Sequence, residues 1–268
     1  MVIEQDVPGT GDPVAADPTS EAGRLAQQSA EAFEDADRSP DPHVKADRLA
    51  AAQALAGDSE LAAAYTYLQR VVGIIAVLLP AVLALGNMLF NGVELRGSIS
   101  GYYYTPVGSV FVGALCALAV FFLSYNYRPL PRYELDNVLG NLACLVALGV
   151  AFFPTTADAA TASGGEKAVA LVHLLCACAL FVLLAVFSLV LFTRTGAGGR
   201  SAAKGRRNIV YRVCGGLIVA TIVLVVVSNI VDPPSSWHSL FWLESVGVVA
   251  FGISWLVKGW RPRLGAPA

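Results

Sequence analysis

LQRVVGIIAVLLPAVLALGNMLF, residues 68–90, is an almost uninterrupted apolar run that is long enough to cross a lipid bilayer. The hydrocarbon core of a bilayer is about 30 Å thick, and an α-helix needs about 20 residues to span it. Because such runs are continuous rather than alternating, they indicate helices and not the strands of a membrane barrel. The sequence therefore predicts an all-α, polytopic bundle of six transmembrane helices, at 68–90, 106–125, 136–154, 167–193, 209–229 and 237–257.

The composition agrees with an integral membrane protein. Of the 268 residues, 56% are hydrophobic and 14% are charged, and the mean hydropathy is +0.61. A soluble domain does not need so large an apolar fraction to fill one core. We expect no cofactor, no disulfide and no metal site, since every cysteine falls inside a predicted span, where it acts as a small apolar residue. These are Cys116, Cys144, Cys176, Cys178 and Cys214.

The distribution of Lys and Arg predicts the orientation in the membrane. Ten basic residues lie in the second and fourth connections and after the last span, whereas the opposite side has only Arg96 and Lys167. Basic residues next to spans are retained in the cytoplasm during insertion. We therefore expect both termini to be cytoplasmic. Membrane topology accounts for the basic clusters, so nucleic-acid binding is not expected.

The chain is predicted to have three parts. Residues 1–60 carry 13 acidic and 4 basic residues and few large apolar ones. Such a segment cannot bury enough apolar surface to offset the entropy of ordering, so a largely disordered cytoplasmic tail is expected. Residues 61–260 form the transmembrane domain, and 261–268 form a short cytoplasmic C-terminus.

A polar layer lies near the predicted cytoplasmic side. Asp136, Asn137 and Asn141 lie on one side of the third predicted helix. A charge within the membrane is retained only with a partner or a use. We predict that Asp136 pairs with Arg212 or Arg207 in a structural inner clasp, because opposite charges at a similar depth lower each other's desolvation cost.

A second polar layer lies near the opposite side. His173 in the fourth span and Glu244 in the sixth lie at comparable depths. If both face the bundle interior, they can form a buried pair. The loop SISGYYYTPVG, residues 98–108, is at the same level. The candidate ligand-binding residues are His173, Glu244, Tyr102, Tyr103, Tyr104, Trp242, Ser98 and Ser100.

A structural interpretation accounts for most of this second layer. The tyrosines and Trp242 lie where an aromatic belt at the membrane surface is expected, and a lone intramembrane histidine is commonly a hydrogen-bonded packing residue. Glu244 is the residue for which a functional role is favoured, because an unexplained acid within a span is costly.

Five segments carry a resemblance to a known group. SISGYYYTPVGSVFVG, DNVLGNLACLVALGVAFFPT, the intramembrane His173, RRNIVYRVCG and WLESVGVVAFGISWLVKG occur in this order. Over residues 70–259 the chain resembles uncharacterised bacterial six-span membrane proteins, which are distantly similar to the DRAM and FRAG type superfamily. The resemblance implies a six-helix domain in a bacterial inner (plasma) membrane, and it brings no established activity.

Three functions remain open from the sequence. The first is a noncatalytic module with an outward-facing pocket that binds a lipid head group or a small solute, with membrane lipid as the partner. The second is an intramembrane hydrolase, metal-assisted or not, in which a serine, His173 and Glu244 act as nucleophile, base and orienting acid. The third is a small-solute transporter. The oligomeric state is left open.

Overall fold

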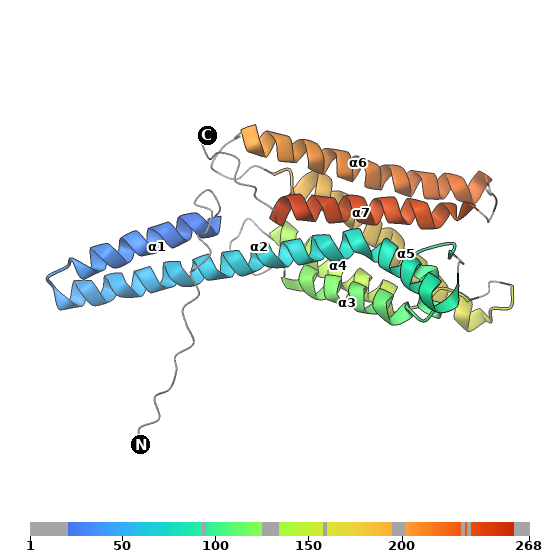
Figure 1. Cartoon of the computed structure of the whole chain (residues 1–268), viewed down its shortest axis with the longest axis horizontal. Coiled ribbons are helices and arrows are strands. Elements are labelled where there is room, and N and C mark those ends of the chain that lie inside the picture. Colours follow the sequence, from blue (N-terminus) through green and yellow to red (C-terminus); the bar gives the residue numbers. More distant parts are fainter. Residues whose placement is uncertain are drawn as a thin grey trace, which may run out of the picture. The chain divides into compact units, whose positions relative to one another are not determined.

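The computed structural model describes residues 21–92, 95–124, 134–157, 160–194, 202–231, 234 and 237–259. Within these ranges the chain is helical and has no strand, which confirms the predicted all-α class. The elements are α1 (Glu21–Asp37), α2 (Pro42–Asn91), the 3-10 helix η1 (Ser100–Tyr104), α3 (Gly108–Ser124), α4 (Glu134–Phe152), α5 (Gly164–Val186), the π-helical turn η3 (Phe187–Leu191), α6 (Ala202–Val231) and α7 (Ser239–Gly259) (Figure 1).

Five helices are long and apolar enough to cross a membrane, as expected for a multi-pass membrane protein. They are α2, α4, α5 together with η3, α6 and α7. The helix α3 is equally apolar but has 17 residues. Each of the six predicted runs therefore coincides with an apolar helix, and five of these six helices are long enough to cross a membrane.

The outer surface of these helices is apolar. Leu89 on α2 is 83% exposed, Leu145 on α4 is 67% exposed, and Ile230 on α6 is 79% exposed. A protein surrounded by water rarely exposes so much apolar surface, whereas in a membrane this surface contacts lipid chains, which are equally apolar. The exposed side chains thus support the same membrane assignment as the helix lengths.

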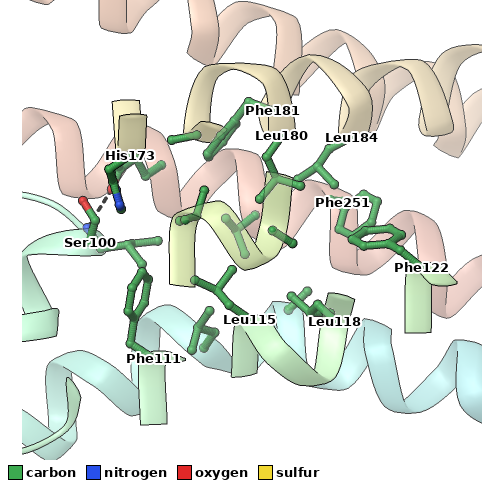
Figure 2. Close-up of a pocket in the computed structure, with 18 residues that line it drawn as sticks. Ser100, Phe111, Leu115, Leu118, Phe122, His173, Leu180, Phe181, Leu184 and Phe251 are labelled. Atoms are coloured by element: carbon green, nitrogen blue, oxygen red, sulfur yellow. Dashed lines mark hydrogen bonds between the residues drawn. The ribbon is translucent and has the colours of Figure 1, made fainter. Parts of the chain in front are cut away.

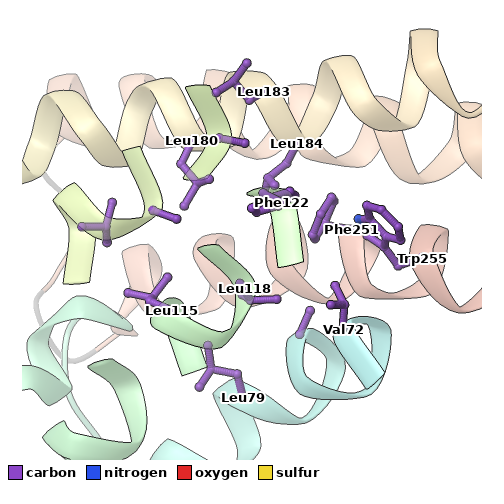
Figure 3. Close-up of a cluster of buried hydrophobic side chains, with 14 of the residues drawn as sticks. Val72, Leu79, Leu115, Leu118, Phe122, Leu180, Leu183, Leu184, Phe251 and Trp255 are labelled. Atoms are coloured by element: carbon purple, nitrogen blue, oxygen red, sulfur yellow. The ribbon is translucent and has the colours of Figure 1, made fainter. Parts of the chain in front are cut away.

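An aromatic cluster fills one part of the core. Trp255 on α7 is fully buried, and its ring lies 4.8 Å from that of Phe121 and 4.9 Å from that of Phe192 between centroids. Both contacts are edge-to-face, the geometry that aromatic quadrupoles favour. Figure 3 shows Trp255 beside Phe251, with Phe122 next to them. This cluster joins α3, α7 and the segment around η3.

The segment that precedes the transmembrane helices contains two helices within the described residues. The helix α1 spans Glu21–Asp37, and α2 begins at Pro42. Ion pairs join the two helices, from Lys45 to Asp37 at 2.7 Å and from Arg48 to Asp35 at 2.7 Å. The physical reason is local, because Ala-rich sequence has high helix propensity without a large apolar core. Residues 1–20 and 261–268 lie outside the described residues.

The boundary between the two parts lies within α2. The residues up to Tyr67 belong to one compact unit, and those from Leu68 belong to a second one, which holds the apolar helices. The predicted boundary after residue 60 lies in the same part of α2, and it stays a prediction.

Two glycines let the backbones of α2 and α7 approach closely. A Cβ atom on Gly73 would lie 2.9 Å from the carbonyl oxygen of Gly252, and one on Gly252 would lie 2.8 Å from that of Gly73. Neither backbone can move aside without disturbing its helix. Small residues at helix contacts are a common device in membranes, where close van der Waals packing drives association.

We predict that Gly73→Ala lowers the free energy of unfolding by about 1–3 kcal/mol, because the added methyl group is forced against backbone atoms. The measurement is thermal or denaturant unfolding of the purified protein in detergent. The matched control is Gly216→Ala on α6, where a Cβ atom meets nothing within 4 Å. Equal stability of the two variants would contradict the close contact.

Candidate functional site

A cavity of about 70 Å³ lies among the apolar helices. Its wall is formed by side chains of α2, η1, α3, α4, α5 and α7, and 15 of the 18 lining residues are apolar. The three polar ones are Ser100, His173 and Glu244. We call this space the bundle cavity.

The bundle cavity is elongated, with polar groups at one end. Figure 2 shows His173 and Ser100 at one end and Phe122 and Phe251 at the other. Along α5 the lining residues run from His173 to Leu184, about 16 Å at 1.5 Å per residue. The lining is therefore apolar along most of α5 and polar at one end.

His173 is held by the end of a neighbouring helix. Its ring is buried, and Nδ1 lies 2.7 Å from the carbonyl oxygen of Phe153, the residue after the end of α4. A carbonyl only accepts hydrogen bonds, so Nδ1 carries the hydrogen. In the neutral ring Nε2 is then an acceptor, and it has no hydrogen-bond partner among the described residues.

Glu244 is held by the loop between α2 and α3. Its Oε2 accepts a hydrogen bond of 2.6 Å from the backbone N–H of Ile99, drawn as the dashed line in Figure 2. Ile99 precedes η1, so its N–H has no partner within a helix. Within the described part of the chain, Oε1 of Glu244 has no hydrogen-bond partner.

His173 and Glu244 therefore line one cavity but do not form the predicted buried pair. Each binds a backbone group instead, and no ion pair joins them within the described ranges. The arrangement leaves two hydrogen-bond acceptors beside an apolar space, Nε2 of His173 and Oε1 of Glu244.

The loop residues divide between the cavity and the structure of the loop. Ser100 lines the cavity, and its Oγ lies 3.2 Å from that of Ser98. Ser98 Oγ also accepts a 3.0 Å hydrogen bond from the N–H of Gly101, so it stabilises the turn. Among the predicted binding residues, His173, Glu244 and Ser100 thus reach the cavity.

The aromatic candidates do not line the cavity. Tyr102 is fully buried, and its hydroxyl accepts a 3.3 Å hydrogen bond from the N–H of Arg96. Burial raises the pKa of the Tyr102 phenol, which stays neutral at physiological pH. Tyr103 packs edge-on against Tyr104, whose hydroxyl donates a 2.6 Å hydrogen bond to the carbonyl of Thr155.

Trp242 lies on the outer surface of α7. Its side chain is 57% exposed, and its ring packs against Phe241 at 5.2 Å between centroids. This position fits the aromatic belt that the sequence offered as the alternative to binding.

The groups that a hydrolase would need are not joined in this structure. Ser98 and Ser100 hydrogen-bond to each other, and no serine hydroxyl among the described residues bonds to His173. The chain of contacts from nucleophile to base to acid is therefore not formed. Over the same described ranges, no three His, Cys, Asp or Glu side chains are placed to hold a metal ion.

The inner clasp forms with a different partner. Oδ1 of Asp136 lies 2.6 Å from Nη1 of Arg194, the last described residue after η3. The predicted partners Arg212 and Arg207 are not within ion-pair distance of Asp136 in the described structure, and Arg212 is exposed on α6. The prediction of the partner was wrong because α5 packs against α4, and Arg194, three residues after η3, therefore reaches Asp136 near the start of α4.

The two asparagines of the predicted clasp lie on the same helix as Asp136. Asn137 is half-buried and Asn141 is exposed on α4. The described contact that carries the clasp is the ion pair of Asp136.

Sequence reasoning missed the backbone partners of the two polar cavity residues. One signal was present, because Pro154 ends α4 and frees the carbonyl groups of its last turn. A buried donor such as His173 then satisfies one of them. The N–H of Ile99 leaves no comparable mark in the sequence, since any residue carries a backbone N–H.

Comparison with protein-family models, with curated proteins and with solved structures finds no match to the chain. The resemblance to the six-span bacterial group therefore stays a prediction.

We predict that Asp136→Asn and Arg194→Gln couple by about 0.5–1 kcal/mol in a double-mutant cycle, a modest value because an exposed partner is screened by solvent. The side chain of Arg194 is 43% exposed and that of Asp136 is 13% exposed. Unfolding in detergent provides the four free energies. The control cycle pairs Asp136→Asn with Arg212→Gln and should be additive within about 0.3 kcal/mol.

We predict that the imidazole of His173 is fixed as the Nδ1–H tautomer, because Nδ1 must donate to the carbonyl of Phe153. Nitrogen-15 NMR of histidine-labelled protein distinguishes the two ring nitrogens. The exposed His43 serves as the internal control and should average both tautomers. An Nε2–H signal for His173 would contradict the assigned hydrogen bond.

Proposed function

We propose that this protein is a noncatalytic membrane module that binds a single-chain amphiphile. The alkyl chain lies in the bundle cavity, and the head group lies at His173 and Glu244. The observation that carries the proposal is the form of the cavity, an elongated apolar space with its polar lining at one end. Small-molecule sites are commonly of this kind, mostly apolar with a few placed polar groups.

An alkyl chain is a better occupant of this space than water. An apolar cavity stays dry because water finds too few hydrogen-bond partners inside it. The wall between the two ends is formed by side chains such as Leu115, Leu118 and Leu180. A methylene chain fills such a space and restores the van der Waals contacts that an empty cavity lacks.

The proposal places the cavity in a six-span protein of a bacterial inner (plasma) membrane, with both termini in the cytoplasm. The excess of Lys and Arg in the second and fourth connections supports this orientation. The 17 residues of α3 extend about 26 Å, close to the thickness of a thin bilayer. The sequence resemblance to six-span bacterial proteins points the same way.

The test is crosslinking by a dodecanol that carries a photoreactive diazirine at its methyl end. In nanodiscs we predict labelling at the aromatic end of the bundle cavity, near Phe122 and Phe251, because the hydroxyl head stays beside His173 and Glu244. Peptide mass spectrometry locates the label.

The variant Ala177→Leu should strongly reduce this labelling, since Ala177 lines the cavity one turn beyond His173. Ala147→Leu fills the same cavity from α4 and is used if the first variant folds poorly. The control is Ala220→Leu, which adds the same carbons to an exposed position on α6. Labelling spread over the outer surface, unchanged by the cavity variants, would overturn the proposal.

A further inference from the structure

We infer that the head group bound in the bundle cavity is a primary ammonium, so that the site selects long-chain primary amines over alcohols and carboxylic acids. This inference rests on the proposed function and names its ligand class. It follows from which polar residues line the cavity and from which of their atoms already form hydrogen bonds.

The first atom available to a ligand is Nε2 of His173, which can only accept a hydrogen bond in the neutral ring. Because Nδ1 of His173 donates to the carbonyl of Phe153, Nε2 of the neutral ring has a lone pair and no hydrogen. A ligand that meets this atom must donate a hydrogen bond. A carboxylate, which only accepts, finds no partner in it.

The second free atom belongs to an acid. Oε2 of Glu244 is occupied by the N–H of Ile99, so Oε1 is the atom left for a ligand. One hydrogen bond from a backbone amide does not neutralise a carboxylate. Hydrogen bonds between a carboxylate and a charged donor are about twice as strong as those between neutral groups.

No cationic side chain compensates Glu244 within the cavity. None of the 18 lining residues is Lys or Arg, and no Lys or Arg in the described ranges forms an ion pair with Glu244. An acid in an apolar space without a counter-ion is costly to keep, whereas a ligand that carries a positive charge supplies that counter-ion. Charge complementarity therefore favours an ammonium head.

The number of donors also matches. A primary ammonium has three N–H groups, and the three polar lining residues carry Oε1 of Glu244, Nε2 of His173 and the oxygen of Ser100, which can accept a further hydrogen bond beside that to Ser98. An alcohol can donate to one of these at most. A carboxylate would bring a second negative charge beside Glu244, which is repulsive.

The experiment measures competition against the photoreactive dodecanol by dodecylamine, dodecanol and dodecanoic acid. Zwitterionic nanodiscs are used, and each competitor is expressed as its mole fraction in the bilayer. We expect the amine to compete at about ten-fold lower mole fraction than the alcohol, because it supplies the counter-ion that Glu244 lacks. The acid should compete more weakly than the alcohol.

The variant Glu244→Gln should reduce the ratio between amine and alcohol to about one, since the amide keeps an acceptor for Ile99 but removes the charge. His173→Asn is the second variant and should also reduce the ratio, because the acceptor at Nε2 is lost. The matched control is Glu166→Gln, the same chemical change at an exposed residue that does not line the cavity. The control should keep the full preference for the amine.

The outcomes separate this inference from the proposed function. If all three competitors act equally in the unchanged protein, or if Glu244→Gln keeps the preference, the ammonium assignment is wrong while chain binding stands. If the acid competes best, the charge argument is wrong. If no competitor displaces the probe and Ala177→Leu has no effect, the proposed function itself fails.

Discussion

Polar groups within a lipid bilayer must form their hydrogen bonds inside the protein. The hydrogen bond from the N–H of Ile99 to Glu244 is the contact of this kind on which the arrangement of the site depends. It ties the loop between α2 and α3 to α7. A second bond, of 2.8 Å from the N–H of Phe241 to the carbonyl of Gly97, holds the same two segments together. Because the loop is fixed in this way, Ser100 and Ile99 close one end of the bundle cavity. The hydrogen bond from Ile99 to Glu244 thus fixes the position of the loop. It also occupies Oε2 of Glu244 and leaves Oε1 at the polar end of the cavity.

The positions of the helices could be predicted from the sequence, whereas the partners of the polar residues within them could not. Hydrophobic length located the apolar helices because the bilayer imposes a minimum number of residues on each span. The same reasoning marked His173 and Glu244, since polar residues in such runs stand out. It paired them with each other, and it paired Asp136 with Arg212 or Arg207, because a linear sequence shows depth but not which helices are neighbours. The actual partners were two backbone groups and Arg194.

The N-terminal segment shows what composition leaves open. Its acidic composition predicts disorder, because little apolar surface is available for burial. The described residues from Glu21 are nevertheless helical, and local propensity with ion pairs between α1 and α2 is the physical reason. The three tyrosines of the loop have different surroundings. Tyr102 is part of the core and Tyr104 binds the carbonyl of Thr155, whereas Ile99 and Ser100 are the described loop residues that line the cavity.

The π-helical turn η3 separates the two ends of the fourth apolar segment. The N–H of Phe192 bonds to the carbonyl of Phe187 at 2.9 Å, five residues earlier instead of four. Such a turn contains one residue more than an α-helical turn, so the residues after it are rotated by about 100° around the axis. The extra residue therefore sets the direction of Phe192 toward Trp255 without changing the direction of His173, which lies before the turn. During divergence, the gain or loss of one residue here would turn Phe192 and Arg194, which follow η3, and would leave the α5 residues of the bundle cavity in their original register.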